Sequence, residues 1–198
     1  LNGVIDQLNI KTQAVLRSWD GAAFYEQATN NPAWAYLDAL TGKQVTRPVK
    51  DARVDLDAIR ELADWCEAQG LAYHWVHDGP ETVLERARAI LAAGQASFAL
   101  QDGRYSMVRD DPEAPVLQVI TPRNASGFES SRQYRSLPHA LRVKYIDPAT
   151  WTDAERIVYR DGYSEANATI FEDLQLQGVA SAEEAYHHGQ YHFRQAIL

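Results

Sequence analysis

The sequence predicts an α+β fold, and three patterns lead to this prediction. Between residues 80 and 93, apolar side chains recur at three- and four-residue steps, which is typical of a helix with one buried face. Ala96–Gln101 and Arg104–Arg109 then alternate around Asp102-Gly103, the dipeptide best suited to a type I′ hairpin turn. After residue 123, strand-like runs separated by turn residues end in a helical pattern. We therefore expect a small α/β lobe combined with a mainly antiparallel β lobe and a C-terminal helix.

The N-terminal stretch Ile10–Trp19 alternates as a strand does, and Asp20-Gly21 ends it. We expect this strand, within residues 1–19, to join the second lobe at 123–198. The first lobe, at 20–122, would then be an insertion in the second.

Two helices are predicted next. Asn31-Pro32 begins a helix that runs to Leu40, because Asn is a strong N-cap and Pro fits the first turn. Asp55 caps a second helix, whose apolar stripe includes Cys66 and which Gly70 ends. The aromatic run 71–76 is expected as a strand. With the helix at 80–93 and the strand at 96–101, it would form a β-α-β unit.

Several short runs predict the remaining strands. They are Val116–Ile120, Phe128–Arg135, Leu141–Ile146, Arg156–Tyr159 and Ala168–Leu176. Ser181 and Glu184 form a capping box before the C-terminal helix. The expected apolar face of that helix consists of Ala182, Ala185, Tyr186, Gly189, Phe193, Ala196 and Ile197.

Composition excludes several classes of protein. The chain has 198 residues, of which 45% are hydrophobic, but no apolar run approaches the ~20 residues that a membrane span needs. The net charge of −8 argues against binding to nucleic acid or to an anionic membrane. The single cysteine, Cys66, excludes an internal disulfide and a multi-cysteine zinc site. Because the chain begins without Met and ends within a helical pattern, we expect a fragment of a longer protein.

The C-terminal helix carries the most obvious metal candidates, His187, His188 and His192. His188 and His192 are four residues apart, a spacing that can bind zinc on a helix. However, both lie opposite the expected apolar face, together with Glu184 and Gln195. We expect this side of the helix to be solvated and to bind no metal.

A second candidate is a proton-shuttling pair of His74 and His77, with Asp78, near Cys66. On a strand, residues three apart point to opposite faces, so the two histidines would not share a substrate. Cys66 lies in the apolar stripe of its helix, where a thiol acts as a small hydrophobic group. We therefore expect no Cys–His catalysis.

Four acidic residues near the hairpin, Asp102, Asp110, Asp111 and Glu113, suggest either a calcium site or a glycosidase carboxylate pair. Turn and loop chemistry already accounts for their positions, so solvated loop charge is the preferred interpretation. The sequence also lacks a Gly-rich phosphate loop, a GxSxG motif and an HExxH motif. No catalytic, cofactor-binding or metal residue is predicted, and the chain is not expected to be an enzyme.

Charge is unevenly distributed in the second lobe. The segment 147–184 is mostly acidic, and the preceding segment contains a group of cations, Arg123, Arg132, Arg135, Arg142 and Lys144. In a monomer these charges are solvated. In a ring or trimer, opposite patches on neighbouring subunits would meet and set the register.

Four blocks resemble the tail-tip attachment (host-specificity, central tail fibre) protein of lambda-like siphophages and related prophages. They are NPAWAYLDALTG at 31–42, ERARAILAAGQASFALQDGRYSMVRDDPEAPV at 85–116, ALRVKYIDP at 140–148 and AYHHGQYHFRQAIL at 185–198. The resemblance implies the hub portion of a long trimeric protein that joins the tail tube to host attachment and DNA ejection. It also implies a virion protein without catalytic residues or cofactors. Its partners would be other tail-tip and tail-tube proteins, and it would bind neither membrane nor specific nucleic acid sequences.

Two other functions stay open at this stage. Aromatic residues such as Trp34, Tyr36, Trp75 and Trp151 would serve as stacking platforms in a module that binds a host-surface glycan or protein. A cell-wall hydrolase is a third and remote possibility, because the sequence carries no acid/base or metal signature.

Overall fold

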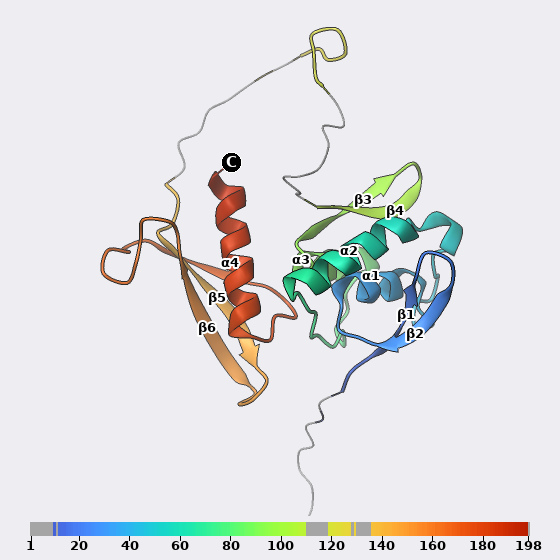
Figure 1. Ribbon diagram of the computed structural model, residues 1–198, viewed down its shortest axis with the longest axis horizontal. Coiled ribbons are helices and arrows are strands. Elements are labelled where there is room, and N and C mark those ends of the chain that lie inside the picture. Colours follow the sequence, from blue (N-terminus) through green and yellow to red (C-terminus); the bar gives the residue numbers. More distant parts are fainter. Residues whose placement is uncertain (1–9, 11, 110–118, 128, 130–135, 198) are drawn as a thin grey trace, which may run out of the picture.

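The computed structural model describes residues 10, 12–109, 119–127, 129 and 136–197. Two lobes lie side by side, each with its own hydrophobic core (Figure 1). The first lobe contains the elements up to residue 109, and the second contains those from residue 140 onward. The predicted α+β class is confirmed.

The first lobe packs helices against two separate hairpins. Its helices are α1 (Pro32–Thr41), α2 (Leu56–Gln69) and α3 (Val83–Ala93), with a short 3-10 helix at Asp51–Arg53. Its strands are β1 (Val15–Trp19) with β2 (Phe24–Ala28), and β3 (Ala96–Gln101) with β4 (Arg104–Arg109). The largest fully buried side chains of this core are Tyr36, Leu37, Ile59, Leu62 and Leu91.

The prediction that the N-terminal strand joins the second lobe is wrong. β1 pairs with β2 in an antiparallel hairpin, and its Leu16 and Trp19 pack against the core of the first lobe. The carboxylate of Asp20 accepts hydrogen bonds from the backbone N–H groups of Ala22 and Ala23, both at 2.7 Å. These bonds, that of Ala23 first, lower the pKa of Asp20 and close the turn that brings β2 alongside β1.

The helix ends follow the capping rules, with one correction. Asn31 accepts a hydrogen bond from Ala33 N–H, and Asp55 accepts one from Ala58 N–H, so the predicted starts of α1 and α2 are confirmed. By contrast, α3 begins at Val83 and not at residue 80. Thr82 and Glu85 form a reciprocal capping box there, which fixes the first turn more firmly than Pro80 does.

No strand forms in the segment 71–82, so the predicted β-α-β unit is absent. Its backbone N–H groups bond to three different parts of the chain. The donors are Leu71, Tyr73 and His74, and the accepting carbonyls are those of Cys66, Asn30 and Gly178 respectively. Since these acceptors do not line up along one strand, the segment runs as a loop.

The predicted β3–β4 hairpin forms, and Phe98 lies opposite Met107 and Leu100 opposite Tyr105. Asp102 and Gly103 both have positive φ, at 49° and 74°, as a type I′ turn requires. Leu100 lies near the turn and is 58% exposed, whereas Phe98 and Met107 pack against the core of the first lobe.

Gly103→Val should destabilise the first lobe by about 1–2 kcal/mol, because a side chain in the left-handed region costs roughly that much. Urea unfolding followed by circular dichroism measures the change. Gly103→Asn is the control, since Asn tolerates positive φ and nothing lies within 4 Å of the position that a Cβ would take. Equal losses for Val and Asn would show that backbone strain at this turn is unimportant.

In the second lobe, a three-stranded sheet lies against one helix (Figure 1). The strand order is β6 (Thr152–Tyr159), β5 (Ala140–Asp147) and β7 (Phe171–Gln175). β5 runs antiparallel to β6 but parallel to β7, so the sheet is mixed rather than purely antiparallel. α4 (Ala182–Ile197) covers one face.

Strands were predicted at the positions of β5, β6 and β7, and all three form there. The strand predicted at 116–120 is described only at 119–120, and the one at 128–135 only at 129; neither described part is in a strand. The remaining residues of both runs lie outside the described part of the chain.

Candidate functional site

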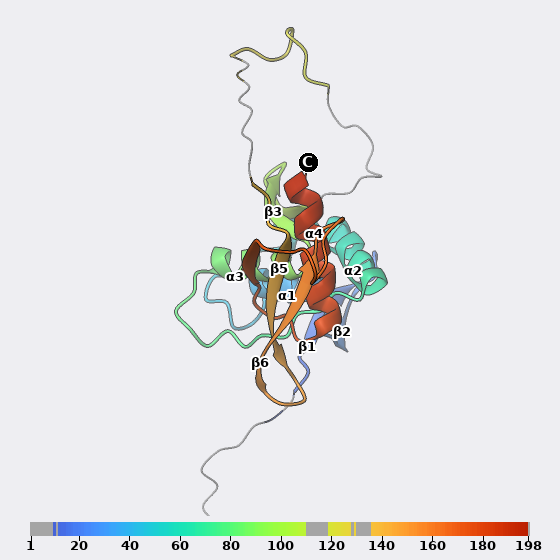
Figure 2. The same cartoon turned by 90° about the vertical axis from the view of Figure 1, so that its left-hand side faces the viewer.

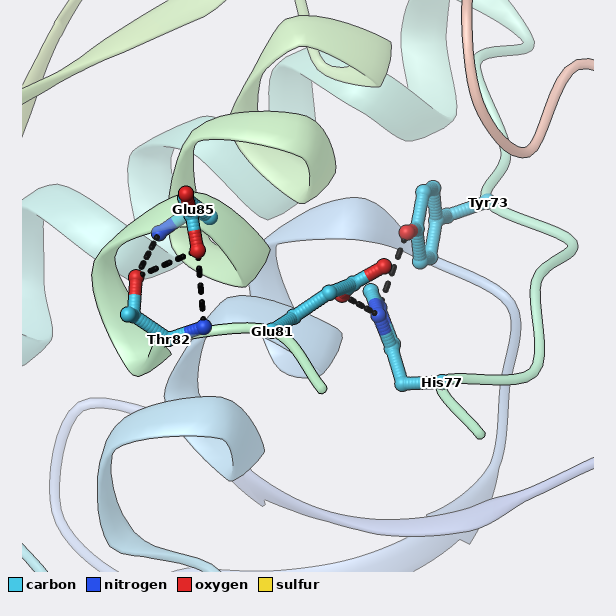
Figure 3. Close-up of polar contacts among 5 residues, drawn as sticks. All are labelled: Tyr73, His77, Glu81, Thr82 and Glu85. Carbon is cyan, nitrogen blue, oxygen red and sulfur yellow. Dashed lines mark hydrogen bonds and ion pairs between the residues drawn. The ribbon is translucent and has the colours of Figure 1, made fainter. Parts of the chain in front are cut away.

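The loop at 71–82 contains a chain of three polar side chains, Tyr73, His77 and Glu81 (Figure 3). His77 Nδ1 lies 2.6 Å from a carboxylate oxygen of Glu81, and His77 Nε2 lies 2.9 Å from the Tyr73 hydroxyl. Because an ionised carboxylate only accepts, Nδ1 donates its proton to the hydrogen bond with Glu81. All three side chains are mostly buried.

This carboxylate–imidazole–hydroxyl order is the one that activates nucleophiles in hydrolases. In this protein, however, burial is the main cause of a raised pKa of Tyr73, and the nearby Glu81 raises it further. The phenol therefore stays protonated and donates a hydrogen bond. The arrangement holds a loop without regular structure against the start of α3.

The side chain of His74 points away from the hydrogen-bonded group of Tyr73, His77 and Glu81 and toward the second lobe. Its Nε2 lies 3.7 Å from a carboxylate oxygen of Glu184 on α4 and 3.5 Å from the side-chain nitrogen of Asn30. His74 and His77 were predicted to lie on opposite faces of a strand, but no strand forms at 71–82. The two histidines still diverge, because each has partners on a different part of the chain.

Cys66 is fully buried, and burial raises the pKa of its thiol to about 12. The thiolate is therefore scarce at neutral pH, and the thiol packs as the predicted small hydrophobic group.

The prediction that α4 has a solvated face at Glu184, His188 and His192 is wrong. His188 is 1% exposed, Glu184 is 9% exposed and His192 is half-buried. The helix is covered on two sides: Ala185 and Phe193 face the sheet, and Glu184 faces the first lobe. An apolar stripe in the sequence identifies only the apolar side of α4. The buried polar side, with Glu184 and His188, has no comparable sequence pattern and was therefore not predicted.

No group of three His, Cys, Asp or Glu side chains is placed to hold a metal ion within the described residues. Asp102 occupies the hairpin turn, whereas Asp110, Asp111 and Glu113 lie outside the part that the structure describes. The same described part contains no helix that is long and apolar enough to span a membrane.

The sheet face opposite α4 is open and charged. Arg142 and Lys144 of β5 approach the carboxylate of Asp173 on β7, at 3.7 and 3.0 Å, and Arg142 also lies 4.7 Å from the centre of the Phe171 ring. A shallow hollow of about 590 Å³ lies here, lined by Arg142, Lys144, Glu155, Ile157, Tyr159, Glu165, Phe171 and Asp173.

This face contains two cations of the predicted basic group, and both have an acidic neighbour within the same chain. Arg123 is described and exposed, whereas Arg132 and Arg135 lie outside the described residues. Because each side chain of the Asp173 cluster is about half exposed, these ion pairs contribute little to stability and their charges stay available to a partner.

The aromatic residues proposed as stacking platforms divide into two groups. Trp34 and Tyr36 are core residues, at 5% and 0% exposure. Trp75 and Trp151 are exposed, at 41% and 53%. Trp151 lies in the turn between β5 and β6 with φ of 58°, an unusual conformation for a bulky residue.

The residues that sequence reasoning missed are Tyr73, Glu81 and Gly178. Tyr73 and Glu81 belong to a loop, and their separation from His77 matches no catalytic motif. Gly178 has φ of 81°, and a Cβ there would lie 2.4 Å from the Tyr73 ring, so only glycine allows the two lobes to approach here.

When the chain is compared with known proteins, no family model matches it, and no curated protein matches it at a significant level.

Proposed function

We propose that this chain is a structural and assembly module of a phage or prophage tail-tip protein. It would form part of the trimeric hub that links the tail tube to host attachment and DNA ejection. Its partners would be tail-tip and tail-tube proteins, and its place would be the virion. The proposal includes no enzymatic activity and no cofactor.

The observation that supports this proposal is where the four blocks of resemblance fall in the fold. The first supplies α1, the second covers most of α3 and all of β3 and β4, the third supplies β5, and the fourth supplies most of α4. These elements build the cores of both lobes.

The open sheet face is the surface we assign to contacts with neighbouring tail proteins. Its half-exposed Arg142, Lys144 and Asp173 offer both signs of charge around a shallow hollow. Such a pattern orients a partner more than it strengthens binding.

Antibodies raised against this chain test the proposal on phage particles induced from the strain that encodes it. We expect gold-labelled antibody to bind the distal end of the tail in electron micrographs. Particles from a strain with the gene deleted are the control, and they should show no label. Intact tails that carry no label in the undeleted strain would refute the proposal.

A second candidate function, a host-surface glycan- or protein-binding module, is favoured by one specific observation. Trp151 is half exposed in a left-handed backbone conformation at a hairpin turn, and such strain often accompanies binding sites. A glycan array with the wild-type chain and Trp151→Ala distinguishes the functions. Binding that the substitution removes would favour this candidate, whereas an empty array would leave the assembly role.

A further inference from the structure

α4 has a second buried stripe, made of polar residues, that faces the first lobe. Glu184, His188 and Tyr191 occupy positions i, i+4 and i+7, so they lie along one side of the helix. Glu184 approaches His74 at 3.7 Å, and the Tyr191 hydroxyl donates to the backbone carbonyl of Gln95 at 3.3 Å. Since both ends of the stripe contact the first lobe, His188 between them lies in the interface of the two lobes. Figure 2 shows α4 from the side, with elements of the first lobe behind it.

The packing around this stripe is close. The backbone N–H of His74 donates to the carbonyl of Gly178 at 2.9 Å, and Gly178 leaves no room for a side chain beside Tyr73. The segment 71–82 therefore docks against both the loop before α4 and the helix itself.

His188 is buried in this interface without polar partners. The residue is 1% exposed, and neither ring nitrogen has a hydrogen-bond partner among the described residues. A neutral imidazole loses one donor and one acceptor bond in such a place. An imidazolium would bury a full charge and two unsatisfied donors, which is far more costly.

The charged and titratable groups around His188 do not compensate for this burial. On its own helix, Glu184 favours the imidazolium, while His192 and His187 oppose it. From the first lobe, His74 approaches Glu184 of the same stripe. The Tyr73 phenol bonds to His77 instead, and Arg156 of the sheet lies over the Tyr186 ring. Burial dominates and lowers the pKa of His188 to about 4, and burial also lowers the pKa of His192.

We propose that His188 is an acid-sensitive latch between the two lobes, whose protonation separates α4 from the first lobe while each lobe stays folded. Each lobe has a separate core, so opening need not disrupt either. Residues 110–139 join the lobes, and their described part, 119–127, 129 and 136–139, contains no helix or strand.

The direction of the effect follows from linkage. In the open state His188 is exposed and titrates near its ordinary value of 6.5, whereas in the closed state its pKa is about 4. The burial of neutral His188 therefore makes its full contribution to the closed state above pH 6.5. This contribution is lost as the pH falls from 6.5 toward 4. From pH 7.5 to pH 5, the opening constant should rise about 30-fold. The His74–Glu184 pair is long, at 3.7 Å, and His74 is 40% exposed, so this pair contributes little to holding the lobes together.

Small-angle X-ray scattering and far-ultraviolet circular dichroism between pH 7.5 and pH 4.5 test the latch on the 198-residue chain. We expect the radius of gyration of the wild type to increase reversibly below pH 6, with an unchanged dichroism spectrum. His188→Leu, which removes the most buried histidine of α4, should expand much less than the wild type. His187→Leu is the matched control, one position away on the same helix, and should expand as the wild type does.

Three results would overturn the proposal: a wild type that stays compact to pH 4.5, a His188→Leu variant that expands like the wild type, or expansion only with loss of the dichroism signal. If His188→Leu fails to fold, the ring proton resonances of wild-type His188 decide the question. A ring that stays neutral until the lobes separate supports the latch. A ring protonated above pH 6 in the compact protein excludes it.

Discussion

Leu91→Ala should lower the free energy of unfolding of the first lobe by about 2–5 kcal/mol, because it removes buried apolar atoms and leaves a cavity. Leu91 is 0% exposed in the core, where α3 packs closely against α1 and contacts β3. Ile90 and Leu91 lie on the apolar side of the helix predicted at 80–93, and both are buried. Urea unfolding followed by circular dichroism measures the change.

The control for this prediction lies on the same helix. Leu84 is 40% exposed, so Leu84→Ala deletes the same atoms without opening a cavity. We expect a loss of at most about 0.5 kcal/mol for that variant. If the two variants lost equal stability, α3 would not be anchored by its buried stripe.

Gly189→Leu should destabilise the second lobe by about 1–3 kcal/mol, because it forces extra atoms into the packed contact between α4 and β6. A Cβ at residue 189 would lie 2.7 Å from Cγ2 and 2.8 Å from Cβ of Val158 on β6. These atoms belong to a fully buried strand residue, so either the helix or the strand must move. Thermal unfolding of the variant and of Gln190→Leu, the next position on the helix, gives the comparison.

A double-mutant cycle shows whether the contact with Val158 is responsible. Gly189→Ala and Val158→Ala should each destabilise the lobe, but the pair should lose less than the sum of the two losses, because the smaller residue 158 makes room for the new methyl group. Strictly additive losses would place the strain elsewhere.

The loop at 71–82 explains how the two lobes are held together. Its backbone bonds to Asn30 in the first lobe and to Gly178 in the second, while its side chains Tyr73, His77 and Glu81 bond among themselves. The internal bonds fix the shape of the loop, and the external ones place it between the lobes. The hydrogen-bond chain of Tyr73, His77 and Glu81 therefore fixes the loop that contacts both lobes.

Local elements were predictable because their signals are local. The caps at Asn31 and Asp55 and the turn at Asp102-Gly103 depend on side-chain bonds and dihedral preferences within four residues, and all three form as predicted. The start of α3 was missed because Pro80 and the Thr82–Glu85 capping box give competing local signals, and the box forms two hydrogen bonds where Pro forms none.

The candidate site was poorly predicted for a different reason. A periodic pattern marks the apolar face of a helix, but it cannot mark a polar face that a second lobe covers. His188 and Glu184 therefore looked solvated, and the 71–82 loop, with its Tyr73 and Glu81, carried no motif at all. These residues acquire their environment only when the lobes dock.

The sequence by itself determined the α+β class, the capped helices α1 and α2, the β3–β4 hairpin and the positions of β5, β6 and β7, since each depends on periodicity or on a short turn. Only the tertiary structure decided that the β1–β2 hairpin packs on the first lobe, that 71–82 is a loop, and that α4 is buried on two sides. The physical reason is that the docking of a hairpin and the burial of polar groups depend on contacts between residues distant in sequence. The free energy of these contacts depends on which surfaces pack together, and no local sequence pattern predicts that packing.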